Sequence, residues 1–229
     1  MRINKYISET GFCSRRETNR LIEAKRITIN GVICEHGATV ENGDLVLIDG
    51  KPLGSKGEPI YLVLNKPVGI TCTAAKHIEG NIIDFVNYPE RIFPIGRLDK
   101  ASEGLILLTN DGDIVNKIMK SEYNHEKEYI VTVDKPFTDS FIEGMANGVE
   151  ILGVKTKPCH VTRISDYVFR IILTQGLNRQ IRRMSKVFGY KVVKLERIRI
   201  MNIKLDQLCI GQWRELTKEE LEQLKLRLQ

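Results

Sequence analysis

The chain has 229 residues, of which 42% are hydrophobic and 28% charged, with a formal net charge of +6 at pH 7. These values predict an ordinary globular chain with one large domain or two unequal ones. No apolar run approaches the ~20 residues that span a bilayer, and the N-terminus lacks the apolar stretch of a signal peptide. The five cysteines lack CxxC spacing and the four histidines lack HxxxH spacing. We therefore expect reduced thiols, a cytoplasmic location and no metal site.

The first fifty residues predict a small helix–helix–hairpin unit. Apolar residues within 3–7 have helical spacing, and the pair Ser14 and Glu17 has the pattern of a capping box that opens a second helix. Residues 27–29 alternate as a strand, and the Asn30-Gly31 dipeptide that follows predicts a tight hairpin turn. A further strand is expected over residues 45–48, ended by Asp49-Gly50.

Charge is segregated within this unit. Residues 1–30 carry seven Lys/Arg against three acids, whereas residues 31–50 carry four acids and no base. Arg15 and Arg16 fall in the first turn of the expected second helix, where the helix dipole disfavours cations. This local penalty suggests that the charge serves a binding role. The alternative is a solvated basic face on an accessory domain.

Residues 50–59 contain three glycines and two prolines, which is typical of a flexible linker. We therefore predict a domain over residues 1–49, a linker over 50–59 and a second domain over 60–229.

The second domain mixes strands and helices. Apolar or alternating runs predict strands over residues 61–64, 105–108, 129–133 and 168–173, and helical spacing is present over 114–119, 139–146 and 218–226. The order lacks regular βαβ alternation. It therefore favours an α+β domain built on a largely antiparallel sheet.

One carboxylate in this domain has no local explanation. Asp111 and Asp113 lie in a turn cluster, and Glu103 lies at the approach to the strand at 105–108. Asp99 instead follows an arginine and a leucine with no turn residue beside it. It is either a solvated loop residue or a carboxylate placed for chemistry.

A second basic cluster lies at residues 176–204, with nine Lys/Arg against one acid. Asn178 is a candidate helix N-cap and Gly189 a candidate helix end. Between them, four bases with the spacing i, i+3, i+4, i+7 form one stripe: Arg179, Arg182, Arg183 and Lys186. A basic stripe suits phosphate contacts, although solvated charge runs are common. Two basic surfaces in one chain favour nucleic acid as the partner.

Longer motifs carry a family resemblance. CSRRE and ITINGV resemble the S4 RNA-binding domain. LNKPVGITCT, FPIGRLDKASEGLILLTNDGD, HEKEYIVTV and QGLNRQIRRM resemble, in the same order, the pseudouridine synthases of the small-subunit rRNA type. HEKEY and KLERIRIMN are most similar to the large-subunit rRNA synthase F branch of that family.

The resemblance implies an isomerase that converts a specific uridine of rRNA to pseudouridine, without cofactor, metal or membrane. The expected substrate is a structured stem-loop of large-subunit (23S) rRNA, with small-subunit rRNA and tRNA as alternatives. The expected oligomeric state is a monomer.

The resemblance also assigns catalytic roles. Asp99 becomes the catalytic carboxylate, because the sugar develops oxocarbenium character that an anion stabilises or captures. Attack on C1′ and removal of a C2′ proton to give a glycal both remain open. Arg182 pairs with Asp99, and Tyr129 packs against the target base. From the residues alone, a surface phosphate contact is a credible alternative role for Arg182, and an ordinary core tyrosine is the favoured interpretation of Tyr129.

RNA-binding residues follow in the same way. The target uridine has to be flipped out of its stack, and Arg97 is expected to contact a neighbouring base. With Asn65 as a weaker candidate, the expected RNA contacts are Arg2, Lys5, Arg15, Arg16, Lys66, Arg97, Arg179, Arg183 and Lys186.

Two other functions compete with this one. A non-catalytic RNA-binding protein of the S4 type explains the basic surfaces but not the loop around Asp99. A metal-dependent nuclease would use Asp99, Asp111 and Asp113 as ligands, but the last two are explained as a turn and a helix start.

Overall fold

The structure is a computed structural model that describes residues 1–55, 57–75, 77–119 and 124–229, so residue 56 of the predicted linker lies outside it. The described chain forms two compact units. The N-terminal unit comprises Met1–Ile60 with the segments Tyr88–Ile92 and Asn110–Gly112. The large unit comprises Tyr61–Asn87, Phe93–Thr109 and Asp113–Gln229.

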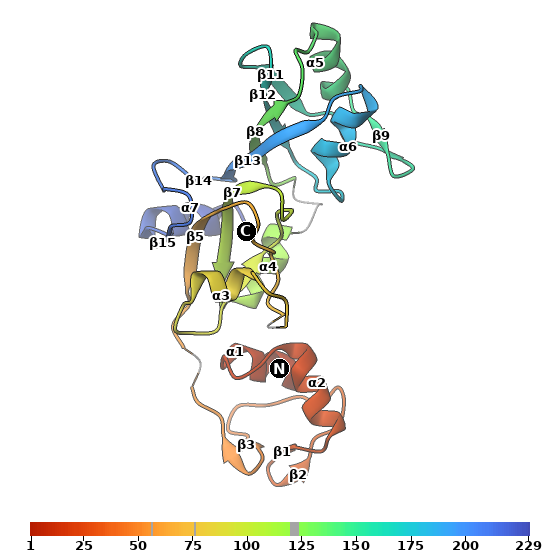
Figure 1. Ribbon diagram of the computed structural model, residues 1–229. Coiled ribbons are helices and arrows are strands. Elements are labelled where there is room, and N and C mark those ends of the chain that lie inside the picture. Colours follow the sequence, from red (N-terminus) through yellow and green to blue (C-terminus); the bar gives the residue numbers. More distant parts are fainter. Residues whose placement is uncertain (56, 76, 120–123) are drawn as a thin grey trace. The chain divides into compact units, whose positions relative to one another are not determined.

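The N-terminal unit is the predicted helix–helix–hairpin arrangement (Figure 1). Two helices pack with a four-stranded sheet in the order β2-β1-β3-β4. Their bounds are α1 Ile3–Glu9, α2 Arg15–Glu23, β1 Ile27–Ile29, β2 Val32–Ile33, β3 Val46–Ile48 and β4 Lys51–Pro52. The Ser14 hydroxyl accepts a hydrogen bond from the Glu17 N–H at 3.1 Å, which caps α2. Asn30 and Gly31 both have positive φ, as the tight hairpin requires.

Part of the predicted linker is ordered sheet. Lys51 and Pro52 pair antiparallel with β3, so the strand β4 extends the sheet of the N-terminal unit. The hairpin turn before it, Asp49-Gly50, has positive φ at both positions. A prediction that the linker begins at residue 50 is therefore wrong at its first residues, because glycine and proline here serve a hairpin and an edge strand.

The large unit is built on a nine-stranded sheet with the order β11-β12-β8-β13-β7-β5-β15, in which β6 also pairs with β7 and β14 with β13. Its strands are β5 Tyr61–Lys66, β6 Phe93–Ile95, β7 Glu103–Thr109, β8 Lys127–Val133, β11 His160–Arg163, β12 Val168–Leu173, β13 Val192–Ile200, β14 Ile203–Lys204 and β15 Trp213–Glu215. A separate hairpin is formed by β9 Glu150–Ile151 and β10 Val154–Lys155. Among the described strands, β13 and β7 form the one parallel pair. The α+β prediction is confirmed.

The helices of this unit that the described residues form are α3 Ile82–Val86, α4 Gly112–Met119, α5 Asp139–Ala146, α6 Gln180–Val187 and α7 Lys218–Leu226. Apolar residues of α4 and α7 share one buried cluster with β5, β7 and the end of β13. Around α5 and α6, a second cluster is aromatic, and the Phe141 ring packs on those of Phe137, Phe169 and Tyr190. The sequence predicted β5, β7, β8, β12, α4, α5, α6 and α7. It did not predict β13, the longest described strand, or the short elements α3, β6, β9, β10, β11, β14 and β15.

Gly104 allows the parallel strands to meet. A Cβ at this position would lie 2.3 Å from the Arg197 carbonyl oxygen and 2.6 Å from the Arg197 nitrogen, and its φ is +104°. Any side chain would force β7 and β13 apart. The glycine therefore fixes the approach of the strand that follows the Asp99 loop to β13.

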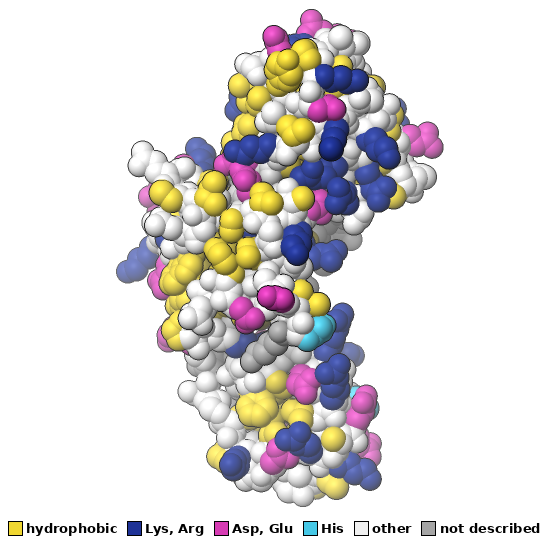
Figure 2. Space-filling model, viewed as in Figure 1, with side chains coloured by type: hydrophobic (Ala, Val, Ile, Leu, Met, Phe, Trp, Pro, Cys, Tyr) yellow, Lys and Arg dark blue, Asp and Glu magenta, His cyan; other side chains and the backbone are white. Residues whose placement is uncertain are grey.

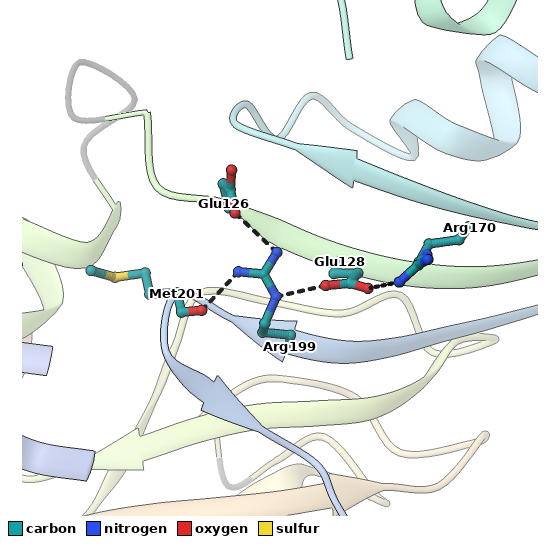
Figure 3. Close-up of polar contacts among 5 residues, drawn as sticks. All are labelled: Glu126, Glu128, Arg170, Arg199 and Met201. Atoms are coloured by element: carbon teal, nitrogen blue, oxygen red, sulfur yellow. Dashed lines mark hydrogen bonds and ion pairs between the residues drawn. The ribbon is translucent and has the colours of Figure 1, made fainter. Parts of the chain in front are cut away.

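On one face of the sheet, charged residues of β8, β12 and β13 form a closed network (Figure 3). Arg199 donates from Nε to Glu128 at 2.6 Å, from Nη2 to Glu126 at 2.9 Å and from Nη1 to the Met201 carbonyl at 2.8 Å. Glu128 also accepts from Arg170 at 3.3 Å. Burial alone raises the pKa of the Glu128 carboxyl, but the two arginines outweigh it and hold the pKa below its usual range.

No helix within the described parts of the chain is long and apolar enough to cross a bilayer.

Candidate active site

The loop that carries Asp99 is held from several sides. Its first residue, Gly96, has φ +75°, and a Cβ there would lie 2.7 Å from the sulfur of Met119. Within the loop, the Ser102 N–H donates to the Asp99 carbonyl at 3.0 Å, which closes a turn. The Gly69 N–H donates to the carbonyl of Lys100 at 2.8 Å. Such anchoring places the Asp99 carboxylate in one position before any ligand binds.

Arg182 of α6 joins this loop to the sheet. Its Nη2 donates to the Ala101 carbonyl at 2.9 Å and to the Ser102 hydroxyl at 3.2 Å, and its Nη1 donates to the Val192 carbonyl at 2.9 Å. Its Nε lies 3.9 Å from the Asp99 carboxylate, is buried, and has no hydrogen-bond partner among the described residues. Burial lowers the pKa of Arg182, nearby Arg179 lowers it further, and Asp99 opposes both.

The sheet register places four residues in one row across four neighbouring strands. Tyr129 of β8 pairs with Arg197 of β13, Arg197 with Gly104 of β7, and Gly104 with Lys66 of β5. Directly paired residues share a face of the sheet. The row therefore brings a tyrosine, an arginine and a lysine to the face above which the Asp99 loop begins.

A cavity of about 640 Å³ lies at this row. Its wall includes Asp99 and Ser102 from the loop, Tyr129 from β8, Arg197 from β13 and Gln180 from α6. A volume of this size is within the range of about 300–1,000 Å³ that is usual for small-ligand sites. Among the described residues, Asp99 is the only carboxylate in the wall.

The remaining charge in the wall is positive. It comes from Arg97, Lys127, Arg179 and Arg197. Figure 2 shows further Lys and Arg side chains gathered on the face of the large unit that carries α6. One carboxylate among cations suits a polyanionic ligand on whose sugar or base the carboxylate acts. Among the described residues, no group of three or more His, Cys, Asp or Glu is arranged to hold a metal ion.

Two bases of the large unit, Lys66 and Arg197, are buried. Lys66 is fully buried and donates to the Pro67 carbonyl at 2.7 Å, so the prediction that it contacts RNA is wrong. Burial lowers the pKa of its amine, and neighbouring carboxylates including Asp99 partly restore it. Arg197, one of the nine bases within residues 176–204, is only 3% exposed. Simple alternation along β13 does not reveal this, because a register shift between Arg197 and Arg199 places the two arginines on opposite faces.

The basic stripe differs from its prediction at its start. Arg179, not Asn178, is the N-cap of α6, with φ 50° and no side-chain capping bond. Asn178 is otherwise engaged, because its carbonyl and its side chain accept from the guanidinium of Arg183 at 3.0 and 3.1 Å. Gly189 has positive φ just after the helix, as expected. Arg179 and Lys186 are exposed.

The other expected RNA contacts differ in how exposed they are and in whether they form ion pairs. Arg97 is exposed at the cavity, and Arg2, Arg15 and Arg16 are exposed in the N-terminal unit. None of Arg2, Arg15 and Arg16 makes an ion pair with a described residue, whereas Lys5 lies 3.5 Å from Glu9.

Known proteins match the chain over both units. A family model described as RNA pseudouridylate synthase matches residues 60–186, and an S4 domain model matches residues 1–46. The dual-specificity RNA pseudouridine synthase RluF of Salmonella typhi is 55% identical over 222 residues, which cover 96% of this chain and 77% of that protein. The ribosomal large subunit pseudouridine synthase B of Bacillus subtilis is 34% identical over 98% of this chain and 95% of its own length.

A solved structure agrees with these matches. A crystal structure of a pseudouridylate synthase superposes with a TM-score of 0.73 at 31% identity, covering 98% of this chain and 99% of the other. The resemblance inferred from the motifs is confirmed by these comparisons. The chain belongs to the RNA pseudouridylate synthase family, whose members isomerise uridine in RNA, and it carries an S4 domain at its N-terminal end.

Proposed function

We propose that this chain converts a uridine of ribosomal RNA to pseudouridine and that Asp99 is the carboxylate that acts on the sugar. The observation that carries the assignment is that Asp99 is the one carboxylate among the described residues of the cavity wall, on a loop anchored by Arg182 and Gly69. A carboxylate that is fixed in position and close to one guanidinium suits stabilisation or capture of a cationic sugar centre.

The two other catalytic roles follow from position. Arg182, with Nε 3.9 Å from Asp99, attracts the carboxylate and keeps the loop in place through Ala101 and Ser102. Tyr129 is 9% exposed and lies in the cavity wall, where its ring packs against the base. Asp99 acts either by attack on C1′ or by removal of the C2′ proton.

RNA contacts lie around the cavity and in the N-terminal unit. Because stacking in an RNA helix hides C1′ and C5, the target uridine is flipped out of the helix when it enters the cavity. The exposed Arg97 contacts the RNA strand from which the uridine was flipped. Phosphates are held by the exposed bases Arg179 and Lys186 with Arg183, and by the N-terminal unit through Arg2, Lys5, Arg15 and Arg16.

The substrate class rests on the names of relatives. One relative of 55% identity is named for dual specificity, and relatives of 34% identity are named for the large and the small ribosomal subunit. We place large-subunit rRNA first, with a stem-loop as the unit recognised. The enzyme acts in the cytoplasm as a monomer and without a metal.

The test is release of tritium from RNA carrying 5-tritiated uridine, because bonding at C5 expels that hydrogen. Purified full-length protein is incubated with transcripts of large-subunit rRNA, small-subunit rRNA and tRNA. We expect release from the large-subunit transcript, unchanged by EDTA. No release from any transcript would contradict the synthase function, and chain cleavage that EDTA abolishes would indicate the metal nuclease.

A further inference from the structure

Arg197 has an incomplete set of partners. Its Nε donates to the Leu105 carbonyl at 2.7 Å, a contact between residues 92 positions apart. Its Nη2 is buried and has no hydrogen-bond partner among the described residues. Buried donors are nearly always satisfied, and the few exceptions call for a functional or structural reason. Since Arg197 belongs to the cavity wall, a ligand in that cavity is the nearest source of an acceptor.

The neighbours of Arg197 suggest what that acceptor is. In the strand row it lies directly between Tyr129, which we assign to the target base, and Gly104, which follows the Asp99 loop. The guanidinium is therefore on the base side of the site. It also lies within electrostatic reach of Lys127, because burial lowers the pKa of Lys127 and the charge of Arg197 lowers it further. This part of the wall suits negative charge.

The reaction produces negative charge on the base. When C1′–N1 breaks, its electron pair leaves with uracil, and the charge spreads over N1 and the two carbonyl oxygens. C5 then supplies an electron pair to C1′, the C5 hydrogen leaves as a proton, and N1 takes up a proton. Nothing is oxidised or reduced. The uracil anion exists only after the C1′–N1 bond has broken and before the C1′–C5 bond has formed.

We propose that Arg197 is a further catalytic residue, whose free guanidinium edge binds a carbonyl oxygen of the detached uracil and stabilises its negative charge. The proposal rests on the proposed function, because it requires a uracil that leaves C1′. A preformed charged donor in a water-poor site acts as an oxyanion hole does. Tethering of Nε to Leu105 fixes the guanidinium so that little reorganisation is needed.

Gln180 is the rival donor. It is 4% exposed, lies in the same cavity wall, and its Nε2 also has no partner among the described residues. Its Oε1 accepts a hydrogen bond from the Leu177 N–H at 3.0 Å. This contact holds the preceding loop and is a structural reason for Gln180 to lie in the wall. Being neutral, it is the weaker acceptor of developing charge.

The test is a double-mutant cycle in which one change is made in the protein and the other in the RNA substrate. Single-turnover pseudouridine formation is measured for wild type and Arg197→Gln on an RNA whose target is uridine, 2-thiouridine or 4-thiouridine. We expect Arg197→Gln to lower the rate on uridine by about 100-fold, as loss of one oxyanion donor does. Replacing the contacted oxygen by sulfur should then slow the wild type far more than the variant. Intrinsic effects of sulfur on the base cancel, because they act on both proteins.

Controls separate catalysis from structure. Arg199→Gln changes the same residue type on the same strand and should give the same sulfur penalties as wild type. If Arg197→Gln fails to fold by circular dichroism, Arg197→Lys replaces it, and we expect it to keep more of the rate than any neutral substitution. Equal sulfur penalties in wild type and variant at both oxygens, or unequal penalties only in Gln180→Met, would overturn the proposal. A wild type that forms no pseudouridine would instead contradict the proposed function.

Discussion

The two faces of the strand pair β8 and β13 use arginine in opposite ways. On one face Arg199 has partners for Nε and both Nη atoms, and Glu128 between Arg199 and Arg170 completes a closed network. On the other face the Leu105 carbonyl is the one hydrogen-bond partner of the Arg197 side chain among the described residues, and its Nη2 is unpaired there. A buried charge that serves the fold is fully paired, because an unpaired one is costly. Arg197, which is left partly unpaired among the described residues, lies in the cavity wall, where a ligand can supply the missing acceptor.

Asp99 and Glu128 differ in the same way as Arg197 and Arg199. Asp99 is the cavity carboxylate, and its one ion pair with a described residue is to Arg182 at 3.9 Å. Glu128, in contrast, pairs with both Arg199 and Arg170. Asp99→Asn should reduce tritium release to background while RNA affinity stays within a few-fold, because the amide neither carries charge nor accepts a proton.

Asp113→Asn is the matched control, since Asp113 lies in the first turn of α4 and a nuclease would need it as a ligand. Release well above background from purified Asp99→Asn would refute its catalytic role.

Arg182 can be compared with two other bases of the same stripe, Arg179 and Lys186. Its side chain is 13% exposed and anchored to the Asp99 loop, whereas Arg179 and Lys186 on the same stripe are exposed. Arg182→Ala should lower the saturated single-turnover rate by about 100-fold, the scale of one lost charge-stabilising group. Arg179→Ala and Lys186→Ala should leave that rate within a few-fold and weaken binding.

The measurement is the rate against RNA concentration for the three variants side by side. Equal losses of the saturated rate in all three would make Arg182 only another phosphate contact.

The closed network should affect stability without affecting chemistry. Glu128→Gln removes the shared carboxylate from between two arginines, and we expect a loss of about 2 kcal/mol and a fall in melting temperature of about 4–8 °C. Because the folded pKa of Glu128 is lowered, its contribution is present above the unfolded pKa of about 4.3 and is lost as pH falls through the folded value.

Melting temperatures from pH 7 to pH 3 for wild type and variant check this. The difference between them should shrink as the pH falls. A constant difference would mean that Glu128 acts through packing rather than through its charge.

The smallest effect concerns the N-terminal unit, where paired and unpaired arginines also coexist. Arg26 forms two hydrogen bonds with Asp49, at 2.8 and 2.5 Å, whereas Arg15 and Arg16 have no acidic partner among the described residues. The double change Arg15→Ala and Arg16→Ala should flatten the slope of log affinity against log salt by about 1.5, if each holds one phosphate.

Arg26→Ala is the control and should leave that slope unchanged. The saturated rate should not change in either variant, because the tethered unit raises occupancy and not reactivity. If the double variant is folded yet inactive at saturating RNA, the N-terminal unit positions the uridine itself.

The sequence by itself determined the features that depend on neighbours along the chain. Period-two alternation placed β8, an apolar run placed the core of β7, and the Asn30-Gly31 pair placed the first hairpin. These patterns report local geometry, which any folded context preserves. The long motifs also carried the family, and with it the expectation for Asp99.

The tertiary structure alone decided which way the bases face. Residues two apart on a strand normally share a face, but a register shift between Arg197 and Arg199 pairs the first with Tyr129 and the second with Glu128. Lys66 is buried because β5 lies beside β7, and Gly104 lets β13 approach β7. A bulge, a buried lysine and a glycine contact all depend on strands far apart in sequence, so no local pattern in one sequence encodes them.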